Sequence, residues 1–244
     1  MLGKTKTKYI QSLGQKKHRD DERLFIAEGP KIVAEMLETV PGSISQVYAL
    51  SSWARENEGR YNASLVTEVS EDELSKISQL HTPNQVLAVI RQFPSSAPPP
   101  AKGNIILALD TIQDPGNLGT IIRIADWFGI AHIVCSHECA DLYNPKVVQS
   151  TMGSIARVQL HYTSLPAWLA TQKETRIYAA ALEGQDITKM NTLIEGIIVI
   201  GNESKGISAP VMEQVNVRIT IPQKGKAESL NAAVAAGIIV SHLV

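Results

Sequence analysis

Hydrophobic residues gather in five short runs after residue 104, and polar stretches separate these runs. The runs are residues 105–110, 132–136, 176–181, 197–201 and 217–221. Each is apolar at nearly every position, which is typical of a strand buried on both faces. Longer stretches with helical spacing lie between them. The sequence therefore predicts an α/β fold, a parallel sheet covered by helices.

A second, smaller set of apolar runs precedes these five runs in the sequence. Four apolar runs alternate with helical stretches such as 30–40. The runs are 24–29, 45–50, 63–69 and 85–91. The sequence PSSAPPPAKG follows, and its three consecutive prolines exclude a helix or a central strand. We therefore predict a small α/β domain over 1–94, a proline-rich linker over 95–103 and a larger α/β domain over 104–244.

The composition is that of a folded, globular chain. Of 244 residues, 44% are hydrophobic and 19% are charged, which excludes a disordered or collagen-like protein. The longest apolar run, 232–240, is about half as long as a membrane span, and residues 1–15 lack the apolar core of a secretory signal. Cys135 and Cys139 are too few for a disulfide scaffold. We therefore expect a cytoplasmic protein without a membrane segment.

The net charge of −1 means that contact with nucleic acid would require a local basic patch. The first 19 residues contain six basic side chains and no acidic one. These side chains are Lys4, Lys6, Lys8, Lys16, Lys17 and Arg19. They predict a phosphate-binding segment, because each neutralised phosphate releases counterions. A solvent-exposed helix face explains the same pattern equally well.

The segment LALDTIQDPGNLGTIIRIADWFGI, residues 107–130, is the first with a chemical signature. A buried strand ends at Asp110, a turn follows, and a helix is expected to begin near Asn117, a favourable N-cap residue. On this helix Gly116 and Gly119 share a face with Arg123, whose planar guanidinium suits a phosphate. The alternative interpretation is purely structural: Gly116 is a turn residue, and Arg123 is a charged residue on the surface.

Two later segments place loops at the carboxyl ends of strands, where open α/β sheets bind ligands. IIVIGNESKGIS, 197–208, resembles a P-loop but lacks its Lys-Ser/Thr pair, which argues against a nucleotide triphosphatase. Its Glu203 is either a functional carboxylate or the partner of an arginine. In VRITIPQKGKAESLNAAVAAGIIVSHLV, 217–244, Ser229 is expected to cap a terminal helix of small residues. Such a helix suits either a tightly packed core or a subunit interface.

Together these three segments resemble the SpoU/TrmH family of the SPOUT class, RNA ribose 2′-O-methyltransferases that use S-adenosylmethionine. The resemblance rests on DPGN-x-G-x-x-x-R at 114–123, GNE-x-x-G at 201–206 and IP…ESLN at 221–231, in the family's order and spacing. Residues 1–94 resemble the family's ribosomal-protein-like RNA-binding domain. The resemblance implies a methyltransferase that acts on RNA, with rRNA favoured over tRNA, and a C-terminal trefoil knot.

The resemblance also implies roles for individual residues. Loops of the knot would hold the methyl donor, with contacts from Gly201, Ile221 and Leu230. Arg123 would be the catalytic centre. Because a guanidinium keeps its proton far above neutral pH, proton abstraction by an arginine is costly. We therefore expect Arg123 first to bind the phosphate and hydroxyl of the substrate, with base catalysis as the alternative role. The residues expected to orient it and the ribose are Asn117, Glu203, Ser229 and Asn231.

The family forms homodimers, and we expect the terminal helix over 229–243 to lie in the interface. We expect no metal ion, because Cys135, His137 and Cys139 lack a second group of ligands. A non-catalytic RNA-binding relative is the alternative function. The presence of all five expected catalytic residues favours the enzyme.

Overall fold

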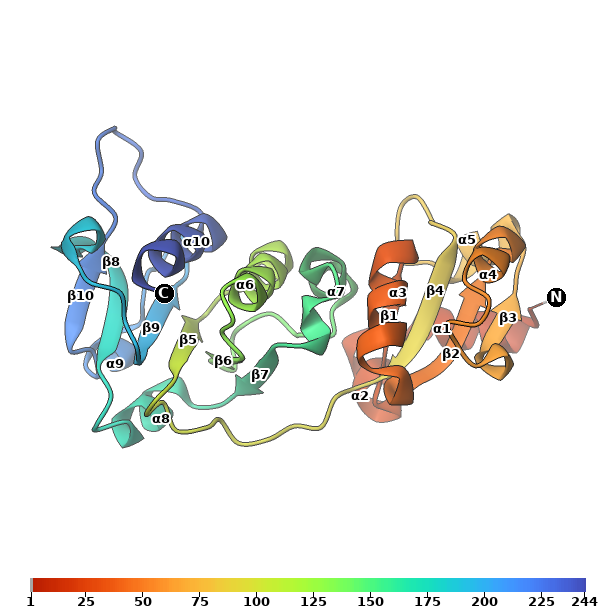
Figure 1. Cartoon of the computed structure of the whole chain (residues 1–244), viewed down its shortest axis with the longest axis horizontal. Coiled ribbons are helices and arrows are strands. Elements are labelled where there is room, and N and C mark those ends of the chain that lie inside the picture. Colours follow the sequence, from red (N-terminus) through yellow and green to blue (C-terminus); the bar gives the residue numbers. More distant parts are fainter. Residues whose placement is uncertain (1) are drawn as a thin grey trace. The chain divides into compact units, whose positions relative to one another are not determined.

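The computed structural model describes residues 2–244, which form two compact units (Figure 1). The N-terminal unit comprises residues up to Pro94 together with Asp141–Ala156. The C-terminal unit comprises Ser95–Ala140 and Arg157–Val244. The segment Asp141–Ala156 therefore packs with the N-terminal unit, although its place in the sequence suggested the larger domain. No helix in the part of the chain that the structure describes is long and apolar enough to span a membrane.

A four-stranded mixed sheet is the centre of the N-terminal unit. Its order is β1-β4-β2-β3, with β4 antiparallel to both neighbours and β3 parallel to β2. The strands are β1 (Leu24–Glu28), β2 (Ile44–Ala49), β3 (Val66–Glu68) and β4 (Val86–Arg91). The four predicted runs are confirmed, but the third is shorter because Ala63–Leu65 forms a 3₁₀ turn.

Six helices surround this sheet. They are α1 (Lys4–Ser12), α2 (Lys16–Glu22), α3 (Pro30–Thr39), α4 (Ser51–Glu56), α5 (Glu71–Ile77) and α7 (Pro145–Thr151). In α5 the Ser70 hydroxyl accepts from the Glu73 N–H while the Glu73 carboxylate accepts from the Ser70 N–H, a capping box that fixes the start of the helix. Ile10 of α1 and the following Leu13 are fully buried in the core.

The segment Asp141–Ala156 is held in the N-terminal unit by apolar and polar contacts. Val147 and Val148 of α7 are buried. The ring of Tyr143 lies 4.9 Å from that of Phe25 in β1, and the Tyr143 hydroxyl accepts from the N–H of Phe93 at 2.8 Å. Because these partners belong to 1–94, the segment completes the core of that unit.

The C-terminal unit is built on a six-stranded, wholly parallel sheet with the order β10-β8-β9-β5-β6-β7. Its strands are β5 (Ile105–Asp110), β6 (His132–Cys135), β7 (Gln159–Tyr162), β8 (Ile177–Asp186), β9 (Gly196–Gly201) and β10 (Val217–Thr220). The predicted α/β fold with a parallel sheet is confirmed. The apolar pattern did not reveal β7, because Gln159 and His161 interrupt it.

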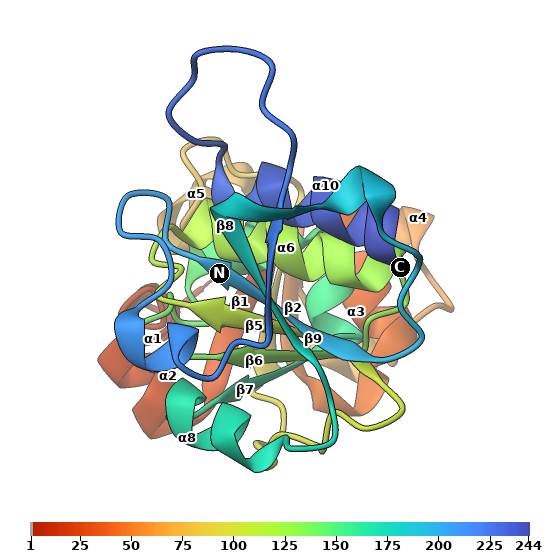
Figure 2. The ribbon, with the colours of Figure 1, turned by 90° about the vertical axis from the view of Figure 1, so that its left-hand side faces the viewer.

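Helices cover both faces of this sheet (Figure 2). The helices are α6 (Pro115–Trp127), α8 (Leu165–Thr171), α9 (Ala209–Met212) and α10 (Ala232–Leu243). On one face, Leu165 and Leu169 of α8 and Val211 of α9 join the core with the strands. On the other, α6 and α10 lie side by side (Figure 1), and a Cβ added at Gly237 would be 3.4 Å from the side chain of Ile124. Small residues on α10 thus permit close helix packing within one chain.

Two predicted helix starts are wrong by a few residues. The N-cap of α6 is Asp114, whose side chain accepts from the Asn117 N–H at 2.8 Å, and Pro115 occupies the first turn. The N-cap of α10 is Asn231, not Ser229, and its side chain accepts from the N–H groups of Ala233 and Val234. These two corrections leave the side chains of Asn117 and Ser229 available for other contacts.

Candidate functional site

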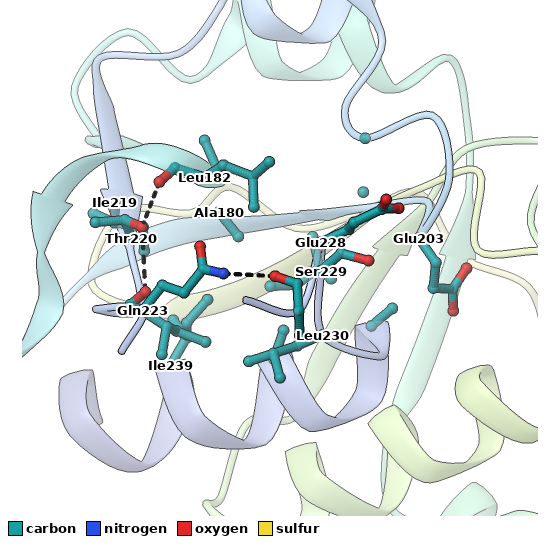
Figure 3. Close-up of a pocket in the computed structure, with 18 of the residues that line it drawn as sticks. Ala180, Leu182, Glu203, Ile219, Thr220, Gln223, Glu228, Ser229, Leu230 and Ile239 are labelled. Atoms are coloured by element: carbon teal, nitrogen blue, oxygen red, sulfur yellow. Dashed lines mark hydrogen bonds between the residues drawn. The ribbon is translucent and has the colours of Figure 1, made fainter. Parts of the chain in front are cut away.

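A pocket of about 600 Å³ lies at the carboxyl edge of the C-terminal sheet. The loops that follow β9 and β10 form most of its wall, and residues of β8 and α10 complete it (Figure 3). Its apolar lining includes Ile200, Ile219 and Ile239. Ile239 belongs to α10 and Leu230 lies beside that helix, whereas Glu203 lies at the side of the pocket away from Thr220 (Figure 3). The size and the mixture of apolar side chains with loop backbone suit a small-molecule site.

Five of the predicted site residues line this pocket. They are Gly201, Glu203, Ile221, Ser229 and Leu230. The three residues expected to contact the cofactor are all among them. The second and third sequence motifs, which are separated by β10, therefore meet around one cavity.

The glycines of the second motif shape the wall of the pocket. A Cβ at Gly201 would lie 2.5 Å from the carbonyl carbon of Gly206, so no larger residue fits without displacing backbone. Gly206 has φ +68°, a left-handed conformation that favours glycine. Asn202 and Gly206 exchange backbone hydrogen bonds of 3.0 and 2.9 Å. The result is a tight loop whose backbone faces the pocket.

A shift in strand register opens the side of the pocket formed by β8. Arg218 of β10 pairs with Ala179, but the next residue, Ile219, pairs with Gln185. The skipped part of β8 includes Ala180 and Leu182, which line the pocket. The Thr220 hydroxyl donates to the Leu182 carbonyl at 2.9 Å and holds this part of β8 in place (Figure 3). The sequence motifs gave no indication of this contribution.

The loop after β10, residues 222–230, stands clear of the rest of the ribbon (Figure 2). The Gln223 side-chain amide donates to the Ala227 carbonyl at 2.6 Å and closes the loop on itself. Lys224 and Glu228 are exposed and line the mouth of the pocket. Polar and charged groups therefore surround the entrance.

Three predicted catalytic residues meet beside the pocket. The Asn117 side-chain N–H donates to the Glu203 carboxylate. The Asn231 side-chain N–H donates to the Asn117 carbonyl oxygen at 2.9 Å. Asn117 therefore joins the second motif to the third, and this Glu203–Asn117–Asn231 network connects the first turn of α6, the loop after β9 and the N-cap of α10.

Arg123 does not join this network. It lies exposed on α6, outside the pocket lining, and makes no hydrogen bond or ion pair within residues 2–244. Trp127, one turn further along the helix, is 83% exposed. A guanidinium without a protein partner remains available to an anionic ligand.

The basic residues near the N-terminus fall into two groups. Five lysines are exposed, namely Lys4, Lys6, Lys8, Lys16 and Lys17. Arg19 is only 2% exposed, and its guanidinium donates to Asp141 at 2.6 Å and to the carbonyl of Leu13 at 3.0 Å. The interpretation of Arg19 as part of an exposed phosphate-binding segment is therefore wrong, because the side chain is committed to the core of the N-terminal unit. Within residues 2–244, no three His, Cys, Asp or Glu side chains are grouped as a metal site would require.

Comparison with known proteins identifies the family. The model of the SpoU rRNA methylase family matches residues 104–241, more than half of the chain. The chain belongs to the SpoU rRNA methylase family. A second model, the MRM3-like substrate binding domain, matches residues 4–88. The SpoU match contains the pocket and the Asn117 network, and the second match covers most of the N-terminal unit.

Relatives and solved structures agree with this assignment over nearly the whole chain. The 23S rRNA (guanosine(2553)-2′-O)-methyltransferase RlmP of Bacillus subtilis is 32% identical, with 98% of this chain and 95% of that protein covered. A structure from Porphyromonas gingivalis, described as of the TrmH family of RNA methyltransferases, has a TM-score of 0.87 at 35% identity and covers 99% of this chain and 98% of its own. An AdoMet-bound rRNA methyltransferase from Sinorhizobium meliloti has a TM-score of 0.83 at 31% identity, with 99% and 95% covered.

Proposed function

We propose that this SpoU-family protein transfers a methyl group from S-adenosylmethionine to a ribose 2′-hydroxyl of RNA. The observation that carries the proposal is the Glu203–Asn117–Asn231 network, which sets polar side chains from all three motifs beside one pocket. A relative that only binds RNA would not need these groups placed together at the pocket.

The pocket suits S-adenosylmethionine. Its volume of about 600 Å³ lies within the range of small-molecule sites. Ile221 and Leu230 offer apolar surface, and the tight turn at Gly201 presents backbone groups for hydrogen bonding. When bound, the cofactor supplies a methyl group on a positively charged sulfur, which is the electrophile. The remaining tasks, alignment of the ribose and removal of one proton, belong to the protein.

Arg123 is assigned to the phosphate beside the reacting ribose. Its side chain is exposed and free of protein partners within residues 2–244, and the planar guanidinium can hold a phosphate and a hydroxyl together. Glu203 is the one carboxylate of the network. It could either orient Asn117 or accept the proton of the ribose hydroxyl. Because Asn117 already donates to this carboxylate, orientation is the role we assign. Ser229, at the pocket wall, is assigned to orienting the ribose.

Ribosomal RNA is the proposed substrate. The relative from Bacillus subtilis is named for 23S rRNA and matches this chain along both units. The exposed lysines of α1, with Lys17 of α2, offer a basic surface for phosphates in the unit that matches a substrate binding domain, whereas Lys16 is paired with Asp20 at 2.6 Å. An rRNA substrate also supports the proposal that the protein acts in the cytoplasm.

The protein is further proposed to act as a homodimer. Trp127 on α6 is 83% exposed, and Val234 on α10 is 51% exposed. These helices pack side by side, so the two exposed side chains belong to one layer of the C-terminal unit (Figure 1). Large apolar side chains exposed on neighbouring helices are typical of a protein interface. The trefoil knot implied by the family is likewise part of the proposal, and the position of β9 between β5 and β8 is consistent with threading.

A methyl-transfer assay tests the proposed function. The protein is incubated with methyl-labelled S-adenosylmethionine and either rRNA or tRNA from cells that lack its gene. Label in rRNA that survives alkaline hydrolysis as a dinucleotide is expected, because a 2′-O-methyl blocks cleavage at that position. Cofactor binding without transfer to either RNA would instead support the non-catalytic alternative, and transfer to tRNA alone would refute the rRNA assignment.

A further inference from the structure

The backbone is unusual at the point where β5 leads into the first motif. Thr111 has φ +61°, in the left-handed region. This conformation is unfavourable for a β-branched residue, and such residues persist only where several contacts hold them. Thr111 follows Asp110, the last residue of β5, and begins the loop that leads to α6, whose first turn carries Asn117.

Contacts from three directions hold Thr111. Its N–H donates to the Ser136 hydroxyl at 3.1 Å, at the end of β6. Its carbonyl accepts from the side-chain N–H of Asn202 at 2.9 Å, in the second motif. Its hydroxyl donates to the Asp110 carboxylate at 3.1 Å. The turn is therefore fixed both to the sheet and to the loop that lines the pocket.

Asp110 fixes the other end of the same loop. This carboxylate is only 3% exposed, and its second oxygen accepts from the N–H of Ser208 at 2.7 Å. Asn202, at the start of the loop, also accepts from the N–H groups of Ser204 and Lys205 at 2.9 and 3.1 Å. The pocket-lining loop is thus held at its beginning through Asn202 and at its end through Ser208.

We propose that Asp110 and Thr111 are positioning residues for cofactor binding. They lie outside the pocket lining, yet the hydrogen bonds of this pair reach both ends of the loop 201–208. They also set the path of the chain towards Asn117, which meets Glu203 of that loop. The pair keeps the wall of the cofactor pocket and the catalytic network in one arrangement. This inference deepens the proposed function, and its test does not depend on the RNA substrate.

The experiment measures the Kd for S-adenosylhomocysteine, the product form of the cofactor, by calorimetry on folded variants. Asp110→Ala should weaken binding by at least about tenfold, because the Ser208 N–H and the Thr111 hydroxyl both lose a buried acceptor. Asp110→Asn should stay within about threefold of wild type. Its amide oxygen can accept from Ser208, and its N–H can donate to the Thr111 hydroxyl after that hydroxyl rotates.

A double variant makes the hydrogen-bond argument specific. Thr111→Val keeps the shape of the side chain and removes the hydroxyl, and alone it should weaken binding about threefold. Combined with Asp110→Asn, it leaves a buried N–H without an acceptor, so the loss should reach about tenfold or more and exceed the product of the two single effects. If the loss of affinity in the double variant equals the product of the losses in the two single variants, the proposed hydrogen-bond exchange is refuted.

Glu28 provides a matched control. It ends β1, is 5% exposed and, like Asp110, accepts from a hydroxyl and a backbone N–H, those of Ser78 and Gln79. Glu28→Ala should lower stability but leave the Kd unchanged, whereas general loosening of the protein would shift both variants. An unchanged Kd in Asp110→Ala, or an equal shift in Glu28→Ala, would overturn the inference. Wild type that binds the cofactor but never methylates RNA would refute the proposed function and leave this test intact.

Discussion

Asn117 offers the sharpest test of the catalytic network. Its amide donates to Glu203 and accepts from Asn231. Asn117→Asp preserves the shape of the side chain and the acceptor for Asn231. It replaces the donor that faces Glu203 with a second carboxylate oxygen. The substitution therefore breaks one of the two hydrogen bonds and leaves the fold and the helix cap at Asp114 in place.

The size of the effect follows from that single contact. A hydrogen bond to a charged group contributes about 1.5–3 kcal/mol. Both side chains are partly exposed, so solvent screens much of the new repulsion between carboxylates. A loss of about 2 kcal/mol corresponds to about a 30-fold decrease in kcat/KM. Binding of S-adenosylhomocysteine should change little, since Asn117 is outside the pocket lining.

Adding Glu203→Gln to Asn117→Asp should restore the contact with its direction reversed, because the new amide can donate to the new carboxylate. We expect kcat/KM of the double variant to return to within about fivefold of wild type, measured by methyl incorporation at saturating cofactor. A double variant as inactive as Glu203→Gln alone would show that the carboxylate accepts the proton. That result would refute the assignment of Glu203 to orientation.

Other substitutions test the remaining roles. Arg123→Ala should leave cofactor affinity unchanged in calorimetry and slow methyl transfer by at least about 1000-fold, and near-normal transfer by Arg123→Lys would show that the planar fork is unnecessary. Trp127→Glu should give a monomeric mass by light scattering at micromolar concentration, and a persistent dimer would place the interface elsewhere. Burial raises the pKa of Glu28 above 4.5, so deprotonation of this carboxyl at neutral pH destabilises the folded state. Glu28→Gln should therefore raise the free energy of unfolding, measured in urea, at pH 7 but not at pH 4. Lys17→Ala should weaken RNA binding in a filter assay without a change in stability, whereas Arg19→Ala should cost about 3 kcal/mol of unfolding free energy.

Most strands of the C-terminal sheet were predictable, because a strand buried on both faces of a parallel sheet is apolar at nearly every position. The run at 105–110 became β5 with the same bounds. Strand β7 was missed because His161 is a buried polar residue, satisfied by hydrogen-bond contacts with Ser96 and His132 that only the fold brings near. Polar side chains with distant partners are invisible to a local pattern.

Helix starts show where a local signal was available but ambiguous. Asp114 and Asn117 are both good N-cap residues, and Pro115, which favours the first helical turn, was the feature that distinguished them. Arg19 is a different case. Its ion pair with Asp141 joins residues 122 positions apart, and nothing near Arg19 in the sequence separates it from the exposed lysines. The Asn117 network likewise depends on the starts of two helices and one loop, which only the folded sheet brings together.

The packing of Asp141–Ala156 with the N-terminal unit makes the two units inseparable by a single cut in the chain. Removal of residues 1–94 would expose Val147 and Val148 and leave Asp141 without Arg19. A chimera that exchanges substrate-binding domains between relatives must therefore exchange two stretches of sequence together. The chain crosses from one unit to the other three times, so substrate choice in such relatives is expected to be inherited through two co-varying segments and not through one transferable module.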